Sequence, residues 1–303
     1  MVRDATSQVT AYNIYRCVTH PTIINSQLPM LKFSQKFLPL LSTLAISTIA
    51  LLPGIAQAQI RYSPLIIEST AEQGQARGII EISNGGSEEF RGRIYAEPFT
   101  YNRDGFVSEK SNLQDLTPFL TFSPREVVIA PRQTRRIRLV SQFLPSTASG
   151  EYRAVIFTEG LEQVQTQGQY SVGIKPRFGI TMYVRLGQTA PNLTVQSASF
   201  NPESKQIVLL VSNKGNASTF PNAIWTLKQG GTTIAKGDSK DFTVIAGKER
   251  NILINFLEKD KKVAAGEYQL TGDLVWGDRE KPQKLPFNIN VTITPQQAAT
   301  ANK

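Results

Sequence analysis

Histidine and cysteine are almost absent from this sequence. Its 303 residues contain one of each, Cys17 and His20, and both precede Met30. The chain beyond Met30 therefore has no zinc, haem or iron–sulfur ligand set built from these residues, and no disulfide bond. Ser-His-Asp and Cys-His catalysis and general-base chemistry by histidine are excluded for the same reason. We expect a protein that is not an enzyme and that uses neither a metal nor a small-molecule cofactor.

Carboxylates are present, but they do not form a recognisable site. The segment Asp238-Ser239-Lys240-Asp241 lacks the alternating oxygen ligands and the downstream glutamate of an EF-hand calcium loop. A hydrolase that uses two carboxylates is the enzymatic alternative that the sequence leaves open. Scattered acids on short strands are more typical of a solvated surface, and we favour that interpretation.

The N-terminal segment has the layout of a secretory signal peptide. A short basic stretch, Met30–Lys36, precedes an apolar run, Phe37–Ile55, which ends at Ala56-Gln57-Ala58. This pattern predicts export, with cleavage after Ala58. A membrane anchor is the alternative, because the run is near the lower length limit for spanning a bilayer. We treat residues 1–58 as an N-terminal extension and signal peptide, and Met30 is an alternative start to Met1.

Positive charge exceeds negative charge only modestly. The formal net charge is +9, and residues 1–58, with four basic residues and one acid, account for +3 of it, which leaves +6 for the rest. A balance of this size, spread along the chain, is weak evidence for any partner. The sequence has no nucleic-acid-binding motif, and we expect no nucleic-acid partner.

Beyond residue 59, short alternating apolar patterns follow one another, and convincing amphipathic helices are missing. Roughly seven strands separated by turns fit residues 59–187, as in an immunoglobulin-like sandwich. A polar linker follows, and the pattern resumes over residues 193–293. Residues 294–303 are small and polar, and we expect a disordered tail. The predicted fold is all-β, with two tandem immunoglobulin-like β-sandwich domains after a cleaved signal peptide.

The two halves share sequence marks. Ile82–Gly86 resembles Val211–Gly215, and Ile129-Ala130-Pro131 resembles Ile245-Ala246-Gly247. A Gly-Glu-Tyr sequence follows in both, with 22 positions between the alanine and Tyr152 or Tyr268. The shared spacing indicates related topology. Gly-Glu-Tyr at a strand start also favours a tyrosine corner, in which the hydroxyl bonds to nearby backbone. Trp225 and Trp276 are expected to fill the second core.

The stretch Gly168–Leu186 reads as one unusually long strand. Its second half alternates Phe178, Ile180, Met182 and Val184 with smaller or polar residues, as a strand does when one face is buried. Its first half also alternates, with apolar side chains at Tyr170, Val172 and Ile174, but it follows a polar loop and looks like a sheet edge. An apolar edge invites another strand to dock.

A cluster of arginines precedes this stretch. They are Arg132, Arg135, Arg136 and Arg138, and the last two alternate with the apolar Ile137 and Leu139. We expect these arginines to project into solvent from a half-buried strand. A patch for an acidic partner or a polysaccharide is the alternative interpretation.

Residues 60–186 resemble the N-terminal domain of PapD-type periplasmic pilus chaperones. The resemblance is carried by Gly78–Asn84, Phe119–Leu139, Glu151–Val155 and the strand that ends Met182-Tyr183-Val184-Arg185. It implies that the long strand is added to an incomplete pilin-like subunit, with main-chain hydrogen bonds giving affinity and alternate side chains filling a groove. The offered residues would be Tyr170, Val172 and Ile174, unless these three pack into the domain's own sandwich.

The resemblance also implies an anchor for the carboxyl terminus of the subunit, made by an arginine on the first strand and a lysine on the last. This sequence has Thr181 at the lysine position and Glu68 or Ser69 at the arginine position. Substitutes for the anchor are Lys175, Arg177 and Arg61, unless these are solvated edge charges. Pro176 interrupts the strand and removes one backbone donor.

We therefore expect a periplasmic chaperone-like protein that binds exported pilus or other β-rich surface subunits by β-strand addition, with an outer-membrane usher as a possible second partner. The alternative is a structural or adhesive cell-surface β-sandwich protein without chaperone activity. The sequence does not determine the identity of the subunit or the relative orientation of the two domains.

Overall fold

The computed structural model describes residues 60–302, apart from 111, 162, 168–169, 175, 241 and 258–260. For residues 163–167 and 170–174, the description covers the backbone only. The predicted signal peptide, with its cleavage point after Ala58, and the candidate anchor Lys175 therefore lie outside the described residues.

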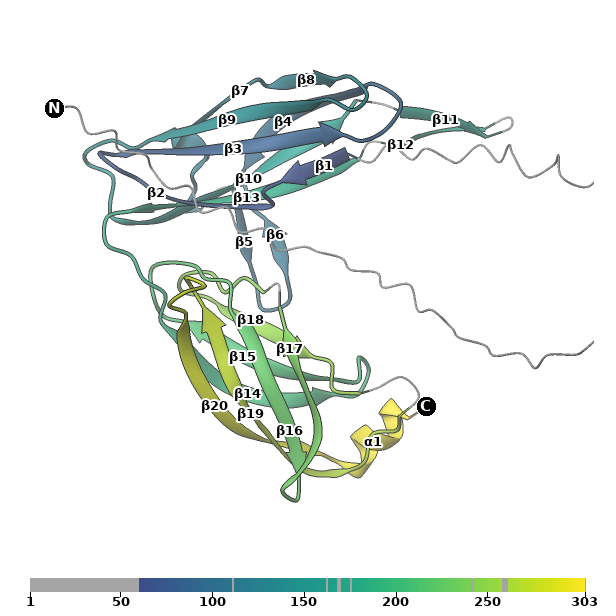
Figure 1. Cartoon of the computed structure of the whole chain (residues 1–303). Helices are drawn as coiled ribbons and strands as arrows, with labels where there is room; N and C mark the ends of the chain where they lie inside the picture. Colours follow the sequence, from purple (N-terminus) through teal and green to yellow (C-terminus); the bar gives the residue numbers. More distant parts are fainter. Residues whose placement is uncertain are drawn as a thin grey trace, which may run out of the picture.

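Two sheets form the first sandwich (Figure 1). The four-stranded sheet has the order β1 (Ile60–Ser63), β3 (Gln75–Asn84), β9 (Thr134–Gln142), β7 (Leu120–Ser123). The five-stranded sheet has the order β2 (Ile66–Thr70), β13 (Arg177–Leu186), β10 (Gly150–Gly160), β4 (Phe90–Glu97), β8 (Glu126–Ile129). Fully buried side chains such as Ile80, Ile137, Ile156 and Ile180 fill the space between the sheets.

The first strand is divided between the two sheets. β1 pairs antiparallel with β3, whereas β2 pairs in parallel with β13. The division falls at Pro64, where the missing N–H cannot continue a ladder. β2 therefore covers only part of β13.

The second sandwich has a three-stranded and a four-stranded sheet. The first has the order β14 (Leu193–Asn201), β15 (Gln206–Asn213), β18 (Glu249–Ile254). The second has the order β17 (Thr232–Ser239), β16 (Asn222–Gln229), β19 (Gly266–Trp276), β20 (Gln283–Ile293). As predicted, Trp225 is buried in this core, and Trp276 packs against it half-buried. The expected all-β fold with two immunoglobulin-like sandwiches is confirmed.

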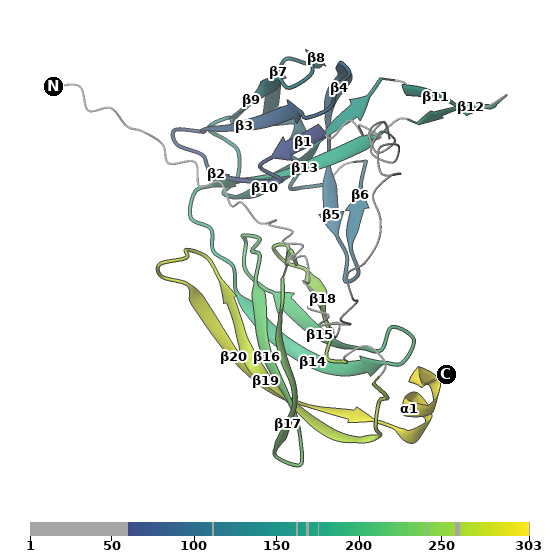
Figure 2. The same cartoon turned by 45° about the vertical axis from the view of Figure 1, so that its right-hand side comes forward.

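Two hairpins extend beyond the first sandwich. β5 (Phe99–Tyr101) and β6 (Phe106–Ser108) reach toward the second sandwich, with the 3-10 turn η1 (Thr117–Phe119) following (Figures 1 and 2). β11 (Gln163–Gln167) pairs antiparallel with β12 (Tyr170–Ile174), and this arm projects from the end of the sandwich. The single strand predicted over Gly168–Leu186 is thus wrong, because β12 and β13 are separate strands in different sheets.

An asparagine turn is repeated in the two sandwiches. Asn84 receives a bond from the N–H two residues ahead and donates to the carbonyl four residues ahead, and its Nδ2 also donates to Ile129 O. Asn213 makes the same three contacts, the last of them to Val244 O at 3.1 Å. Because the hydrogen bonds match Val244 with Ile129, the sequence pairing of Ile129 with Ile245 is displaced by one residue.

Both predicted tyrosine corners are present. The Tyr152 hydroxyl donates to Ala148 O at 2.9 Å, and the Tyr268 hydroxyl donates to Ala264 O at 2.9 Å. The two tyrosines therefore tie the start of β10 and of β19 to the loop that precedes each strand.

The C-terminal segment differs from the predicted disordered tail, because residues 295–301 form a helix, α1 (Pro295–Ala301). Thr294 accepts a bond from Gln297 N–H while the Gln297 side chain bonds back to Thr294 N–H, which is a capping box with proline in the first turn. Ala298 and Ala301 are buried against the second core. Among the residues that the structure describes, no helix is long and apolar enough to span a bilayer.

Replacement of the buried Asn213 by alanine should lower the free energy of unfolding by at least about 2 kcal/mol, because it leaves buried carbonyl and N–H groups without partners. The exposed Asn201 accepts bonds from two backbone N–H groups that water can satisfy, so Asn201→Ala is the control and should cost less than about 1 kcal/mol. Urea unfolding measures both. Equal losses of unfolding free energy in the two variants would show that the Asn213 side chain does not stabilise the turn.

Candidate partner-binding edge

The five-stranded sheet has an open edge along part of β13. β2 pairs with β13 only from Thr181 to Arg185. On the other side, β10 pairs with β13 from Arg177 to Leu186. Among the described strands, none pairs with the outer side of Arg177–Ile180. This stretch, which we call the open edge, carries unpaired backbone groups.

Flanking hydrogen bonds show which of its backbone groups face outward. Thr181 N–H donates to Leu65 O at 3.2 Å on the β2 side, whereas Pro176 O accepts a 2.8 Å bond from the β10 side. Backbone groups of successive strand residues alternate between the two sides. The N–H and C=O groups of Arg177 and Gly179 therefore point to the open edge.

Pro176 lies between the end of β12 and the start of β13, so the predicted interruption of the strand at this residue is confirmed. Its carbonyl accepts from Gly160 N–H, so its ring nitrogen lies on the β10 side of the chain. The donor that proline lacks is thus missing from the inner side. The open edge keeps its own donors at Arg177 and Gly179.

The predicted docking residues lie on β12, next to the open edge in sequence. Tyr170, Val172 and Ile174 have Gln167, Gln165 and Gln163 of β11 as their cross-strand partners. β12 belongs to neither sheet of the sandwich. The β11–β12 arm projects from the end of the sandwich (Figure 1), and β12 precedes the open edge in the chain by two residues.

The alternation predicted for β13 is confirmed on its inner face, where Ile180, Met182 and Val184 are fully buried. Phe178 differs, because it is 37% exposed and stacks on Tyr62 with ring centroids 4.3 Å apart. Burial raises the pKa of Tyr62 to about 12. This aromatic pair places an exposed apolar surface beside the open edge.

The opposite face of β13 is covered by aromatic and aliphatic side chains. A β-carbon at Gly179 would lie 2.9 Å from atoms of Phe157 and Val155, so glycine is required by close packing. The Arg177 guanidinium lies 3.5 Å from the centre of the Phe157 ring and bonds Glu97 at 2.7 Å. Arg177 is therefore held in place by an aromatic ring and a carboxylate.

The candidate carboxylate anchors are not gathered into one site among the described residues. Arg61 is exposed on β1, in the four-stranded sheet, with Ser83 as its cross-strand partner. Arg177 belongs to the five-stranded sheet. Near the position expected for an arginine, Glu68 instead binds Arg185 at 2.6 Å.

The two sandwiches meet in an apolar cluster that the sequence analysis missed. Phe99, Val155, Phe157 and Tyr183 of the first sandwich pack with Ile245 of the second. Phe220 adds an edge contact to the Tyr183 ring at 5.4 Å. One signal was available: Ala154, Val155, Ile156 and Phe157 form an unbroken apolar run, which is typical of a strand covered on both faces.

A buried polar cluster lies beside this apolar contact. Glu151 accepts bonds from the Ser218 N–H at 2.7 Å and from the Ser218 hydroxyl. Arg153 faces Glu151 at 3.6 Å, and Arg185 donates to Ser218 O at 3.1 Å and to Glu68. Because Ser218 belongs to the second sandwich, these bonds join the two domains.

Burial governs the protonation of this cluster. It raises the pKa of the Glu151 carboxyl, against the opposing effects of the Ser218 hydrogen bonds and of Arg153 and Arg185. Burial likewise raises the pKa of Glu68 and lowers that of the Arg153 guanidinium. The cluster is therefore a costly arrangement of charges, stable only while its partners remain together.

The β5–β6 hairpin makes a second connection between the sandwiches. Arg103 at its tip binds Glu249, and its carbonyl accepts from Asn251 N–H at 2.8 Å. Asp104 Oδ1 accepts from the Asn251 side chain at 2.8 Å. These contacts cover the outer side of β18, which would otherwise be an unpaired edge.

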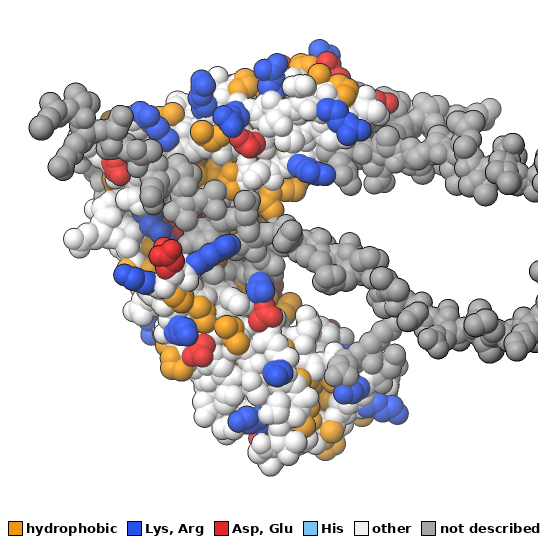
Figure 3. Space-filling model, in the orientation of Figure 1, with side chains coloured by type: hydrophobic (Ala, Val, Ile, Leu, Met, Phe, Trp, Pro, Cys, Tyr) orange, Lys and Arg blue, Asp and Glu red, His pale blue; other side chains and the backbone are white. Residues whose placement is uncertain are grey.

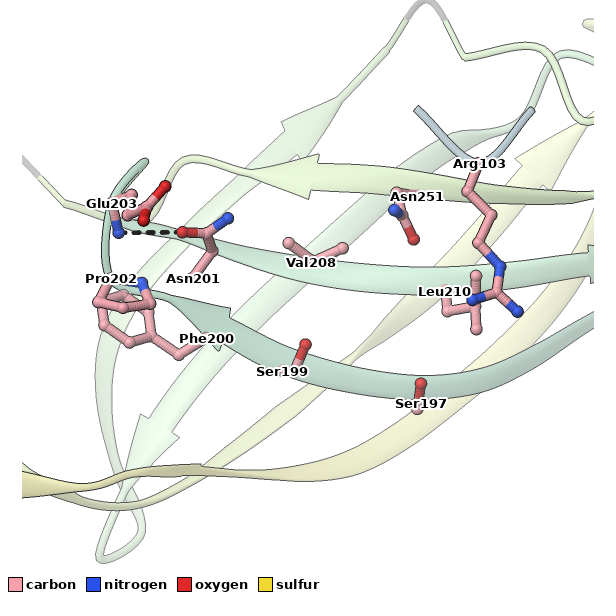
Figure 4. A pocket seen from close by; sticks show the side chains of 10 residues that line it. All are labelled: Arg103, Ser197, Ser199, Phe200, Asn201, Pro202, Glu203, Val208, Leu210 and Asn251. Carbon is pink, nitrogen blue, oxygen red and sulfur yellow. Dashed lines mark hydrogen bonds between the residues drawn. The ribbon is translucent and has the colours of Figure 1, made fainter. Parts of the chain in front are cut away.

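A shallow trough lies on the three-stranded sheet of the second sandwich (Figure 4). Val208 and Leu210 form its floor, Ser197 and Ser199 one side, and Arg103 its end. Arg103 is already bound to Glu249, so the trough offers mainly neutral groups. In the part of the chain that the structure describes, no group of three or more metal-ligating side chains is found.

The contribution of Glu151 to stability should fall as pH rises above 4.5, the ordinary value for a glutamate pKa. The raised pKa of Glu151 means that the folded state keeps a proton which the unfolded state has lost in this window. Glu151→Gln removes this titration, so its unfolding free energy should vary less with pH. Urea unfolding between about pH 4 and pH 8 measures the slope. Glu89→Gln, at an exposed residue, is the control; an unchanged slope in Glu151→Gln would contradict the assignment.

No protein-family model matches this sequence, and no curated protein matches it. Solved structures do. A class 5 fimbriae chaperone, CfaA, has a TM-score of 0.45 and 14% identity over 76% of this chain and 99% of its own. A chain of the complex between SafA pilin and the SafB chaperone of Salmonella enterica has a TM-score of 0.45 and 9% identity, over 76% and 97%.

A chain of the CsuC–CsuE chaperone–tip subunit complex from Acinetobacter baumannii has a TM-score of 0.42 and 12% identity, over 78% of this chain and 99% of its own. These structures contain chaperones of pilus assembly.

Proposed function

We propose that this protein is a periplasmic chaperone-like protein that binds exported pilus or other β-rich surface subunits by β-strand addition along the open edge and β12. The observation that carries the proposal is the unpaired outer side of Arg177–Ile180. A partner strand placed there could pair with the outward groups of Arg177 and Gly179 and continue along β12.

The energy of such binding would come mainly from side chains. Each net main-chain hydrogen bond contributes about 1 kcal/mol, whereas burial of one large apolar side chain contributes about 1.5–3 kcal/mol. Phe178, which stacks on Tyr62, presents an exposed apolar side chain beside the open edge. In the proposal, Tyr170, Val172 and Ile174, which alternate along β12, enter the partner as well.

The domain contacts leave this edge accessible. Tyr183, Arg185 and Ser218 join the sandwiches near the end of β13 that β2 covers. Arg177, Phe178 and Gly179 at the other end are exposed. The second sandwich is therefore anchored without covering the open edge.

The location follows from the proposed partners. Export by the predicted signal peptide would place the protein in the compartment where surface subunits emerge before assembly. An outer-membrane usher is the second partner implied by the resemblance to PapD-type chaperones. If no subunit associates at fixed stoichiometry, the structural or adhesive alternative is favoured.

The substitutions Val172→Asp and Ile174→Asp together should abolish subunit capture and leave the fold intact, because they put charges into the groove of the partner. Ser171→Asp changes the neighbouring residue on the other face of β12 and is the control. Co-purification from the periplasm measures capture, and circular dichroism measures folding. If the double variant unfolds, these side chains belong to the protein's own core and the docking idea fails.

A comparison of two single variants, Arg177→Pro and Arg177→Ala, tests the main-chain hydrogen bond that the N–H of residue 177 would donate to the partner. Both remove the bonds of the guanidinium, but only proline removes the outward N–H at an edge position that tolerates it. We expect Arg177→Pro to bind the captured subunit roughly fivefold more weakly than Arg177→Ala, which corresponds to one net hydrogen bond of about 1 kcal/mol. Titration with the purified subunit measures the ratio. Equal affinities would argue against pairing at this residue.

A further inference from the structure

The outer face of the four-stranded sheet in the first sandwich is strongly basic. Cross-strand register places Arg61 of β1, Arg77 of β3, and Arg136 and Arg138 of β9 on this side, and all four are exposed. We call these four residues the basic face. In Figure 3, blue side chains are spread over the first sandwich.

Charge on this face is poorly compensated. Glu81 is the acidic residue that shares it, and Glu81 binds Arg136 at 2.7 Å. Arg77 bonds only the neutral Gln75 side chain, and neither Arg61 nor Arg138 has an ion pair among the described residues. The face therefore keeps three positive charges that no carboxylate on it offsets.

Short side chains make up most of the surface between the arginines, and they belong to Ser63, Ser83, Thr121, Ser123, Thr134 and Val140. The longer Gln75 and Gln142 lie opposite each other at one end of the face and are joined by a side-chain hydrogen bond of 3.3 Å. Ile79, which is 46% exposed, is the cross-strand partner of Arg138. The long guanidinium side chains thus stand among shorter side chains, two of which, Ile79 and Val140, are apolar.

We propose that the basic face is a docking surface for an anionic membrane surface, where it contacts the phosphate groups of acidic lipids. One guanidinium group can donate two parallel N–H···O bonds to a phosphate group. Several arginines on one sheet can therefore bind several lipid headgroups at the same time. Ile79 can insert its side chain between headgroups at the same time. The ligand chemistry is therefore phosphate presented in a plane.

The position of the basic face favours a lipid surface over an acidic polypeptide. A peptide bound to a folded protein takes an edge, a groove or a pocket for its side chains. The basic face is the outer side of a paired sheet, where β3 and β9 have strands on both sides. Charges spread over three strands match an extended array of phosphates better than a narrow chain.

This orientation would leave the other sites accessible. The contacts with the second sandwich come from the five-stranded sheet, through residues such as Val155 and Tyr183. The basic face belongs to the opposite sheet. A molecule resting on a membrane by this face would present the second sandwich away from the lipid. The inference is independent of subunit capture, so the failure of either leaves the other standing.

Binding to vesicles tests the proposal, with protein recovered after its own export and processing. Vesicles of equal parts phosphatidylglycerol and phosphatidylcholine should sediment the protein, and phosphatidylcholine vesicles should not. Each basic residue near an anionic surface contributes roughly a factor of five in affinity, so Arg77→Gln with Arg138→Gln should weaken binding roughly thirtyfold. Raising the salt concentration to about 0.5 M should release the protein.

Lys281→Gln with Lys284→Gln is the matched control, because it removes the same charge from exposed residues of the second sandwich. It should retain binding within about twofold if the effect depends on the face and not on net charge. Equal loss in both double variants would overturn the proposal. So would equal binding to phosphatidylcholine alone, or binding to polyglutamate without binding to the anionic vesicles. Thermal unfolding of each variant verifies that the fold is retained.

Discussion

Backbone groups at the edge of a β-sheet need partners, and β13 has them along only part of its length. Pro64 divides the first strand, so β2 joins the five-stranded sheet late and pairs with Thr181–Arg185 but not with Arg177–Ile180. Most proteins cover or distort such an edge to prevent unwanted association. Here, the outer side of β18 is covered by the β5–β6 hairpin, whereas the open edge of β13 is extended by a projecting arm.

The contact between the two sandwiches lies at the end of β13 that β2 covers. β10 is buried on both faces, with Ile156 in the first core and Val155 against the second sandwich. A buried carboxylate, Glu151, binds the backbone and hydroxyl of Ser218. Breaking a buried charge network of this kind is costly, because it leaves groups without partners in a low dielectric. The second sandwich is thereby tied to one end of β13, and the other end stays accessible.

The sequence pattern explains most of the fold. Alternation predicted the strands and the inner face of β13, and the Gly-Glu-Tyr motif predicted both tyrosine corners, because these features depend on neighbours in sequence and on local hydrogen bonds. The disordered tail was a wrong prediction, because small polar composition hid the capping box at Thr294 and Gln297. The sequence pairing of Ile129 with Ile245 was another error, by one residue. Val244 occupies the position of Ile129, which allows Ile245 to pack between the domains.

What the sequence by itself determined was the class of protein: all-β, with almost no histidine or cysteine, and with motifs that resemble pilus chaperones. The tertiary structure alone decided which edge is open, which side of the chain Pro176 affects, and that Arg61 and Arg177 belong to different sheets. The physical reason is that alternation reports which face of a strand is apolar. Whether a neighbouring strand covers its edge depends on residues far away in the sequence.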